Sequence, residues 1–153
     1  MFSMYLFILF FFAAPQVQEV SLEQLQANTI QNNDTLYVVN FWATWCKPCV
    51  AEMPYLEEAQ KKFANNKVKV VFVSLNYTRE LAVVDKFVKQ KKILSTCYLL
   101  NAGTPNSWID KVETEWSGSI PATLMYKNGK KIFFREGEFT QTELDSIIQT
   151  KIK

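Results

Sequence analysis

Three apolar segments of the chain have the pattern of buried β-strands. Residues 35–42 and 68–75 carry Leu, Val, Phe and Tyr at successive positions, so both faces of each segment are largely apolar. A shorter candidate strand covers residues 96–100. Strands that are apolar on both faces are typical of parallel sheets with helices on either side. We therefore expect the core to be built around a central sheet.

Two further candidate strands form a predicted hairpin. Residues 122–126 and 131–135 flank the segment Lys127-Asn128-Gly129-Lys130. Asn-Gly is the strongest short hairpin signal, because both residues accept the positive φ angles that a two-residue turn requires. We expect these two strands to pair antiparallel, which would make the sheet mixed.

Between the strands, apolar residues recur with the three- and four-residue spacing of helices. The predicted helices follow Ser21, cover residues 49–65, carry an apolar stripe from Leu81 to Val88, span Trp108 to Trp116, and follow Thr140. Ser21 and Thr140 each stand three residues before a Gln or Glu, which is the spacing of a capping box at a helix start. Pro54 removes one backbone donor and predicts a break with a kink in its helix.

The order of elements from Thr35 onwards is β-α-β-α-β-α-β-β-α, with no internal repeat or linker. The chain has 153 residues, of which 48% are hydrophobic, and this is enough for one domain with a sizeable core. We assign residues 17–153 to a single α/β domain. The net charge of +2 gives no reason to expect a nucleic acid partner, and the lysines between Lys86 and Lys92 are interpreted as the solvated side of a helix.

Cys46 and Cys49 are separated by two residues where the strand over residues 35–42 gives way to a predicted helix. At a helix start this spacing places both side chains on one face, so their sulfurs can form and break a disulfide with little backbone movement. The unpaired amides there favour a thiolate at Cys46 and lower its pKa from the free value of about 8.5. Cys46 is thus the predicted nucleophile, and Cys49 resolves the mixed disulfide.

Other uses of such a cysteine pair are a zinc site and a purely structural disulfide. Zinc would need two further ligands, whereas the chain has no histidine and one other cysteine, Cys97. A disulfide that closes so small a loop would constrain the unfolded chain little. We expect no metal and no cofactor beyond a redox-active disulfide. Cys97 is interpreted as a small buried side chain, and a third redox thiol is the alternative.

The segment Phe41-Trp42-Ala43-Thr44-Trp45-Cys46-Lys47-Pro48-Cys49 resembles the active-site motif of the thioredoxin superfamily. With Asn40 and Glu52 beside it, the chain is similar to the TlpA/ResA type of extracytoplasmic thiol-disulfide oxidoreductase. The resemblance implies a thioredoxin fold, in which a central mixed β-sheet is flanked by helices. It also implies the extra strand and helix that this type carries in its middle.

Glu52 lies three residues beyond Cys49, so on a helix its carboxylate is close to the resolving thiol. A partly buried carboxylate with a raised pKa suits proton transfer near neutral pH. Glu52 is therefore the candidate acceptor of the Cys49 proton, and a solvated helix glutamate is the alternative.

The remaining candidate site residues would bind the substrate. Ile120-Pro121 resembles the loop that in thioredoxin-like proteins holds a cis-proline facing the active-site sulfurs, where the backbone of Ile120 would pair with an extended substrate segment. An ordinary trans proline before an edge strand is the alternative. Trp45 offers a flat apolar contact, Lys47 a positive charge beside Cys46, and Pro48 a rigid helix start.

Residues 4–14 form an apolar run of the length found in secretory signals, which is too short to span a bilayer. We interpret residues 1–16 as a signal peptide or an uncleaved membrane tether, with a buried core segment as the alternative. The fit to a signal is imperfect, because no Lys or Arg precedes Lys47. With such a signal, the protein is expected to be extracytoplasmic, in the periplasm or secreted, where disulfides persist.

The predicted function is reduction of disulfides in exported proteins by the Cys46 and Cys49 dithiol, acting as a monomer. Such a dithiol needs electrons from an upstream thiol donor, such as a membrane protein. The family resemblance suggests clients such as the haem-site cysteines of cytochrome c during its maturation. A disulfide oxidant or isomerase, and a non-catalytic thioredoxin-like binding module, are the alternatives. A peroxide-reducing role is disfavoured, because the sequence lacks a Thr-x-x-Cys arrangement.

Overall fold

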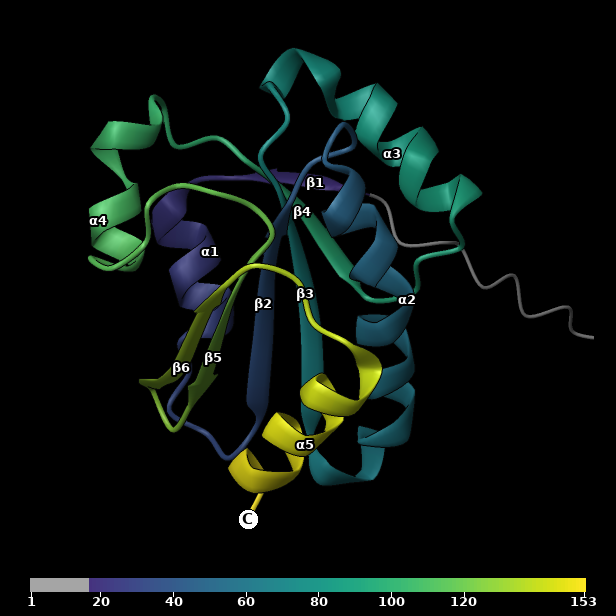
Figure 1. Ribbon diagram of the computed structural model, residues 1–153. Coiled ribbons are helices and arrows are strands. Elements are labelled where there is room, and N and C mark those ends of the chain that lie inside the picture. The colour runs from purple at the N-terminus through teal and green to yellow at the C-terminus, as the bar shows by residue number, and fades with distance from the viewer. Residues whose placement is uncertain (1–16) are drawn as a thin grey trace, which may run out of the picture.

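A computed structural model describes residues 17–153 of the chain. Its strands are β1 (Gln18–Val20), β2 (Leu36–Trp42), β3 (Val68–Ser74), β4 (Thr96–Leu100), β5 (Ala122–Lys127) and β6 (Lys130–Glu136). They form one mixed sheet in the order β1-β4-β3-β2-β5-β6 (Figure 1). The first four strands of this order run parallel to one another, whereas β5 pairs antiparallel with β2 and with β6. The predicted hairpin around Asn128-Gly129 is thus confirmed.

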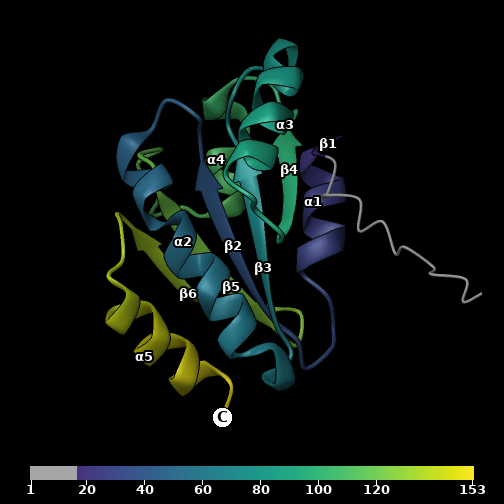
Figure 2. The same cartoon turned by 90° about the vertical axis from the view of Figure 1, so that its right-hand side faces the viewer.

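Helices cover both faces of the sheet. In the described part of the chain they are α1 (Leu22–Thr29), α2 (Lys47–Lys62), α3 (Leu81–Gln90), α4 (Ile109–Val112) and α5 (Gln141–Lys151), with the short 3₁₀ turns η1 (Ala64–Asn66), η2 (Thr78–Glu80) and η3 (Pro105–Ser107). Helices α2, α3 and α5 lie on one face, and α1 and α4 lie on the other (Figures 1 and 2).

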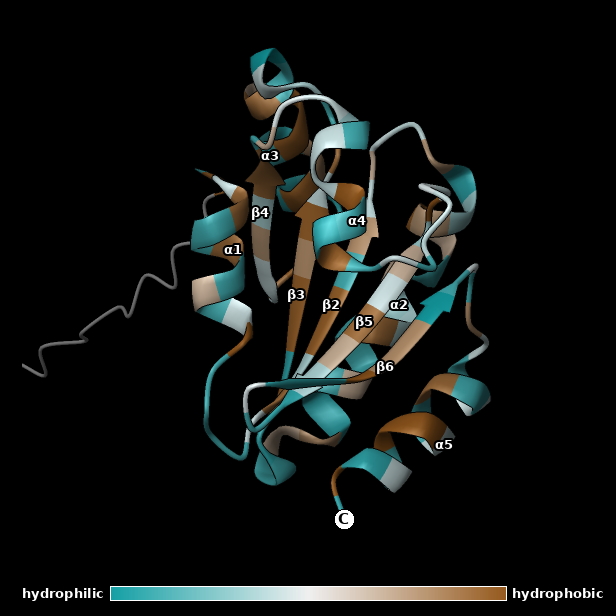
Figure 3. Cartoon of the chain, turned by 90° about the vertical axis from the view of Figure 1, so that its left-hand side faces the viewer, coloured by the Kyte–Doolittle hydropathy of each residue, from teal (hydrophilic) through white to brown (hydrophobic). Residues whose placement is uncertain are grey.

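Strand β2 lies at the centre of this arrangement and is buried at every position. Because successive side chains of a strand point to opposite faces, Val38 packs into the layer under α2, α3 and α5, while Val39 packs into the layer under α1 and α4. Figure 3 shows the resulting apolar colouring along β2 and β3, seen from the side of α1 and α4. Residues 35–42 are therefore apolar on both faces because helices cover both faces of the sheet, as the sequence predicted.

The connectivity is that of the thioredoxin fold. The parallel unit β2-α2-β3 is followed, after an extra helix and strand, by the antiparallel β5-β6 hairpin and the closing helix α5. The added strand β4 inserts between β1 and β3 in the sheet. The predicted fold class is confirmed, including the additional central helix and strand.

Three details differ from the sequence-based expectation. Helix α2 is one continuous element across Pro54, so the predicted break is absent, while the predicted kink stays a prediction. The missing donor of one proline is tolerated because the turns on either side are packed against the sheet. The predicted helix from Trp108 to Trp116 is only the short α4 with η3 before it. Strand β1 was not predicted at all.

The sequence-based assignment of residues 1–16 to a signal peptide or tether lies outside the residues that the structure describes. Across residues 17–153, no helix has both the length and the apolar character needed to cross a membrane.

Candidate active site

The two cysteines of the motif are joined by a disulfide at the start of α2. Strand β2 ends at Trp42, and a short turn leads to Cys46, which is the N-cap residue of the helix. The Cα atoms of Cys46 and Cys49 are 5.3 Å apart. The turn at the carboxyl end of a central parallel strand is where α/β sheets present their functional groups. The sequence thus places the pair at the carboxyl end of an internal strand of the sheet, next to the exposed Trp45.

The sulfur of Cys46 lies between the helix start and the loop before β5. Its Sγ accepts a hydrogen bond from the backbone N–H of Cys49 at 3.3 Å and is 3.7 Å from the carbonyl oxygen of Ile120. The peptide bond between Ile120 and Pro121 is cis. When the disulfide opens, the same N–H and the positive end of the α2 dipole stabilise a thiolate on Cys46.

The residues around the disulfide divide into an exposed and a buried set. Trp45 is 67% exposed, and Lys47 and Pro48 are also exposed. Cys49 has no exposed surface, and Pro121 is buried while Ile120 is half-buried. An incoming protein therefore meets Trp45, Lys47 and Pro48 first, while the resolving sulfur lies beneath them.

Glu52 is buried on α2 with 1% of its surface exposed. One carboxylate oxygen accepts a hydrogen bond from Asn40 Nδ2 at 2.8 Å, and the other accepts from the backbone N–H of Phe139 at 2.9 Å. Burial raises the pKa of the Glu52 carboxyl to about 7, although both hydrogen bonds oppose the shift. A carboxyl group that titrates near neutral pH, one helical turn from Cys49, is chemically able to exchange a proton there.

Asn40 connects this carboxylate to the sheet. It occupies β2 directly opposite Thr123 of β5, and its Nδ2 also donates to the Thr123 hydroxyl at 3.0 Å. Its Oδ1 has no hydrogen-bond partner among the described residues. The amide therefore holds Glu52 through its donor side alone.

Cys97 is the third cysteine and lies in β4, 3% exposed. Burial raises the pKa of its thiol to about 12, so it stays protonated and unreactive at neutral pH. The interpretation of Cys97 as a buried core side chain is confirmed. Among residues 17–153, no three His, Cys, Asp or Glu side chains gather where they could hold a metal ion.

Sequence reasoning missed two contributors to this site. Phe139 binds Glu52 through its backbone N–H across 87 positions of the chain, and a backbone donor leaves no signal in the residue type. Asn76, in the loop after β3, bonds to Thr44 two residues before Cys46. Asn76 stands just after an apolar strand that neighbours the strand carrying the motif. This position is the sequence signal that could have identified it.

Comparison with known proteins agrees with this geometry. A family model described as the AhpC/TSA family matches residues 10–133. The chain is 32% identical over 143 residues to the thiol-disulfide oxidoreductase ResA of Oceanobacillus iheyensis, which covers 89% of this chain and 69% of the relative. It is 35% identical over 113 residues to a ResA of Bacillus cereus, which covers 72% of this chain. The chain spans 60% of the length of that second relative.

Among solved structures, a thiol:disulfide interchange protein of the thioredoxin family from Chlorobium tepidum superposes with a TM-score of 0.65. The match covers 79% of this chain and 82% of that structure, and the identity of 24% makes it a likeness of fold. Together with the Cys46–Cys49 disulfide at the start of α2, the family model and the ResA relatives show that this chain belongs to the AhpC/TSA family and is a thiol-disulfide oxidoreductase of the ResA type.

Proposed function

We propose that this protein reduces disulfides in exported proteins. The observation that carries the proposal is the placement of the disulfide: Cys46, 6% exposed, lies between the start of α2 and the carbonyl of Ile120, beside the exposed Trp45, whereas Cys49 has no exposed surface. A nucleophile that keeps some exposed surface, next to a resolving thiol that has none, suits a two-step transfer of electrons to a protein disulfide.

In the first step, the Cys46 thiolate of the reduced protein attacks one sulfur of the client disulfide. A bond forms between Cys46 and that client sulfur, the client S–S bond breaks, and the second client sulfur leaves as a thiolate. The free N–H groups at the start of α2 hold the Cys46 sulfur in its anionic form, because they point toward the helix N-cap.

In the second step, Cys49 gives its proton to Glu52 and attacks Cys46 Sγ. The Cys46–Cys49 disulfide forms and the client sulfur is released, so the client has gained two electrons and this protein has lost two. The Glu52 carboxylate is suited to take the proton because its pKa of about 7 lies near neutral pH. An upstream thiol donor then reduces Cys46 and Cys49 again.

Recognition of the client would rest on backbone contacts and one exposed aromatic surface. The half-buried Ile120 precedes β5 at the site, so its peptide groups can pair with an extended client segment beside the reacting sulfurs. Trp45, at 67% exposed, offers a flat apolar surface next to Cys46. Backbone pairing tolerates many client sequences, and the class of client would be unfolded or extended segments that carry a disulfide.

The proposed location outside the cytoplasm rests on the apolar run at residues 4–14 and on the chemistry. Disulfides persist in oxidising compartments, and a dedicated reductant is needed there because no glutathione pool keeps thiols reduced. Clients that must receive haem on free cysteines, as in cytochrome c maturation, are one such group. We further propose that the protein acts as a monomer that receives electrons from a membrane thiol donor.

Reduction of insulin by dithiothreitol, followed by the turbidity of the released chains, tests the proposed activity on protein disulfides. We expect the wild-type protein at catalytic concentration to accelerate the reaction well above the dithiothreitol blank, because Cys46 reacts as a thiolate near neutral pH. A rate equal to the blank would exclude protein disulfides of this open kind as substrates and would favour the binding-module alternative.

A further inference from the structure

The turn that carries Cys46 is tied to the loop after β3 by the side chain of Asn76. The backbone N–H of Thr44 donates to Asn76 Oδ1 at 3.0 Å, and Asn76 Nδ2 donates to Thr44 Oγ1 at 2.8 Å. Thr44 stands two residues before the nucleophile. The backbone N–H and the hydroxyl of Thr44 are therefore both bound by the carboxamide of Asn76.

That carboxamide is itself fully engaged. Its oxygen also accepts from the Ser74 hydroxyl at 2.9 Å, and its nitrogen also donates to Glu80 Oε2 at 3.2 Å. A side-chain amide has two acceptor sites and two donor hydrogens, so all four are used. The side chain is 4% exposed, and the Thr44 N–H fixes which end is the oxygen. The Asn76 side chain is thus held in place by four hydrogen bonds, unlike an amide exposed on the surface.

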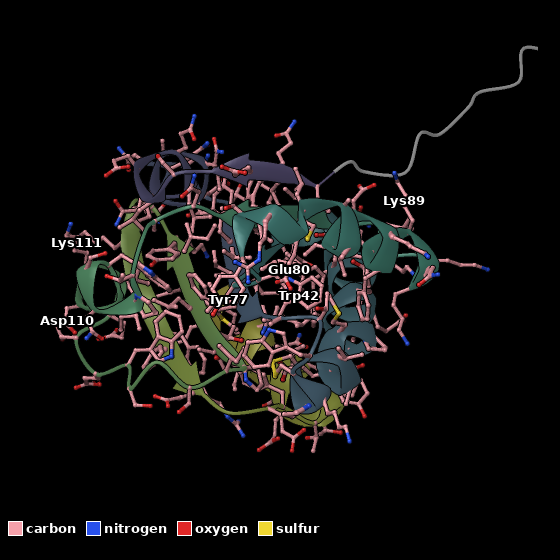
Figure 4. All side chains as sticks on the ribbon, turned by 90° about the horizontal axis from the view of Figure 1, so that it is seen from above. Trp42, Tyr77, Glu80, Lys89, Asp110 and Lys111 are labelled. Atoms are coloured by element: carbon pink, nitrogen blue, oxygen red, sulfur yellow. A yellow bond between two sulfur atoms is a disulfide. The ribbon has the colours of Figure 1, made fainter. Side chains whose placement is uncertain are left out.

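Backbone hydrogen bonds complete the attachment. The N–H of Leu75 donates to the carbonyl of Trp42 at 2.8 Å, and the N–H of Cys46 donates to the carbonyl of Ala43 at 3.1 Å. Figure 4 looks onto this end of the molecule, where Trp42, Tyr77 and Glu80 are labelled. Glu80 also accepts from the N–H of Tyr77 at 3.0 Å, which fixes the loop that presents Asn76.

The position of Cys46 depends on this turn. As the N-cap of α2, Cys46 must keep its sulfur over the first free amides of the helix for those amides to stabilise a thiolate. We propose that Asn76 is a positioning residue for thiol-disulfide exchange: its carboxamide fixes Thr44 and thereby holds Cys46 Sγ at the amino end of α2. This inference rests on exchange at Cys46 and is independent of the direction of electron flow or the identity of the client.

The test measures Cys46 alone, in the full-length protein with Cys49 and Cys97 changed to serine. The rate of Cys46 alkylation by iodoacetamide is followed from pH 5 to pH 10, which yields the thiol pKa and the reactivity at pH 7. We expect Asn76→Ala to raise this pKa and to slow alkylation at pH 7 about tenfold, as the loss of two buried hydrogen bonds to the turn implies. Thr44→Val, which removes one of the two, should slow it about threefold.

Three comparisons separate positioning from a general effect on stability. Thr44→Ser keeps the hydroxyl and should react like the parent protein. The double variant Asn76→Ala with Thr44→Val should react like Asn76→Ala alone, because both changes break the same attachment. Thr29→Ala removes a buried hydroxyl that bonds to the Leu25 carbonyl in α1, and should leave the alkylation profile unchanged.

An unchanged pKa and rate in a folded Asn76→Ala protein would overturn the proposal, and so would equal rates for Thr44→Val and Thr44→Ser. If Asn76→Ala does not fold, the pair of Thr44 variants decides the matter. Because alkylation uses no client disulfide, either outcome is distinct from a failure of the proposed client reduction.

Discussion

Replacing Cys46 by serine is expected to lower disulfide reduction by this protein to the uncatalysed rate. A serine hydroxyl stays protonated near neutral pH, so the nucleophile at the N-cap of α2 is lost and no mixed disulfide can form. The measurement is insulin reduction with dithiothreitol as the electron source. The matched control is Cys97→Ser, which removes a thiol that is 3% exposed and should retain the wild-type rate.

Replacing Cys49 by serine should instead stop the reaction halfway. Cys46 still attacks, but the mixed disulfide with the client has no resolving thiol and accumulates as a covalent complex visible on a non-reducing gel. A Cys49→Ser protein that accumulates no complex, or a Cys46→Ser protein that does, would contradict the assignment of Cys46 as nucleophile.

Changing Glu52 to glutamine is expected to slow the resolving step about 100-fold, which is within the usual contribution of a general base. In the wild-type protein the rate of mixed-disulfide collapse should rise with pH up to about 7, as the Glu52 carboxyl ionises. The glutamine variant should lose this component of the pH profile. Rapid mixing of the reduced protein with a disulfide peptide measures the step directly.

Glu58→Gln is the matched control for Glu52→Gln, because Glu58 is exposed on the same helix. It should leave both the rate and its pH dependence unchanged. Equal pH profiles for wild type and Glu52→Gln would exclude Glu52 as the proton acceptor and would leave it with the structural task of binding Asn40 and Phe139.

The same carboxyl group should also make stability depend on pH. Its pKa is raised from 4.5 in the unfolded chain to about 7 in the folded one, so between these values the folded protein keeps a proton that the unfolded chain releases. Its contribution to the free energy of unfolding therefore falls as pH rises from about 4.5 to 7 and is constant above. Relative to wild type, Glu52→Gln should gain on the order of 3 kcal/mol between pH 4 and pH 8 in denaturant titrations.

The central strands could be predicted from sequence because burial on both faces leaves a visible run of apolar residues. This holds for β2 and β3, and the Asn128-Gly129 turn marked the hairpin in the same direct way. Strand β1 escaped prediction because it has three residues, of which Val20 alone is buried. It is a strand because its backbone pairs with β4, and backbone pairing has no signature in so short a segment.

The predicted helix from Trp108 to Trp116 shows how spacing can mislead. Both tryptophans are buried, and each packs against Phe41 on the face of the sheet, with ring centroids 6.1 and 4.8 Å away. A loop that folds back on the sheet brings them there, and the Trp116 indole N–H donates to the carbonyl of Ser119. These residues are therefore apolar because they pack on the sheet, and their helical spacing does not indicate a long helix.

For the site, the sequence predicted Cys46, Cys49 and Glu52 from residue type and spacing, and the structure joins the two cysteines in a disulfide with Glu52 buried on the same helix. What the sequence could not identify were the partners that arrive from distant segments. The N–H of Phe139 and the carboxamide of Asn76 reach the site only because the fold brings them there. Neither contact can be predicted from the residue type.

The reduction potential of the Cys46–Cys49 pair tests most directly whether the protein is a reductant. Equilibrating it with defined mixtures of reduced and oxidised dithiothreitol or glutathione, and counting the thiols, gives the value. We predict a potential near that of thioredoxin, about −270 mV, which favours electron flow from this protein to client disulfides. A potential near −120 mV, typical of a strong oxidant, would contradict the proposed direction and identify the protein as a donor of disulfides.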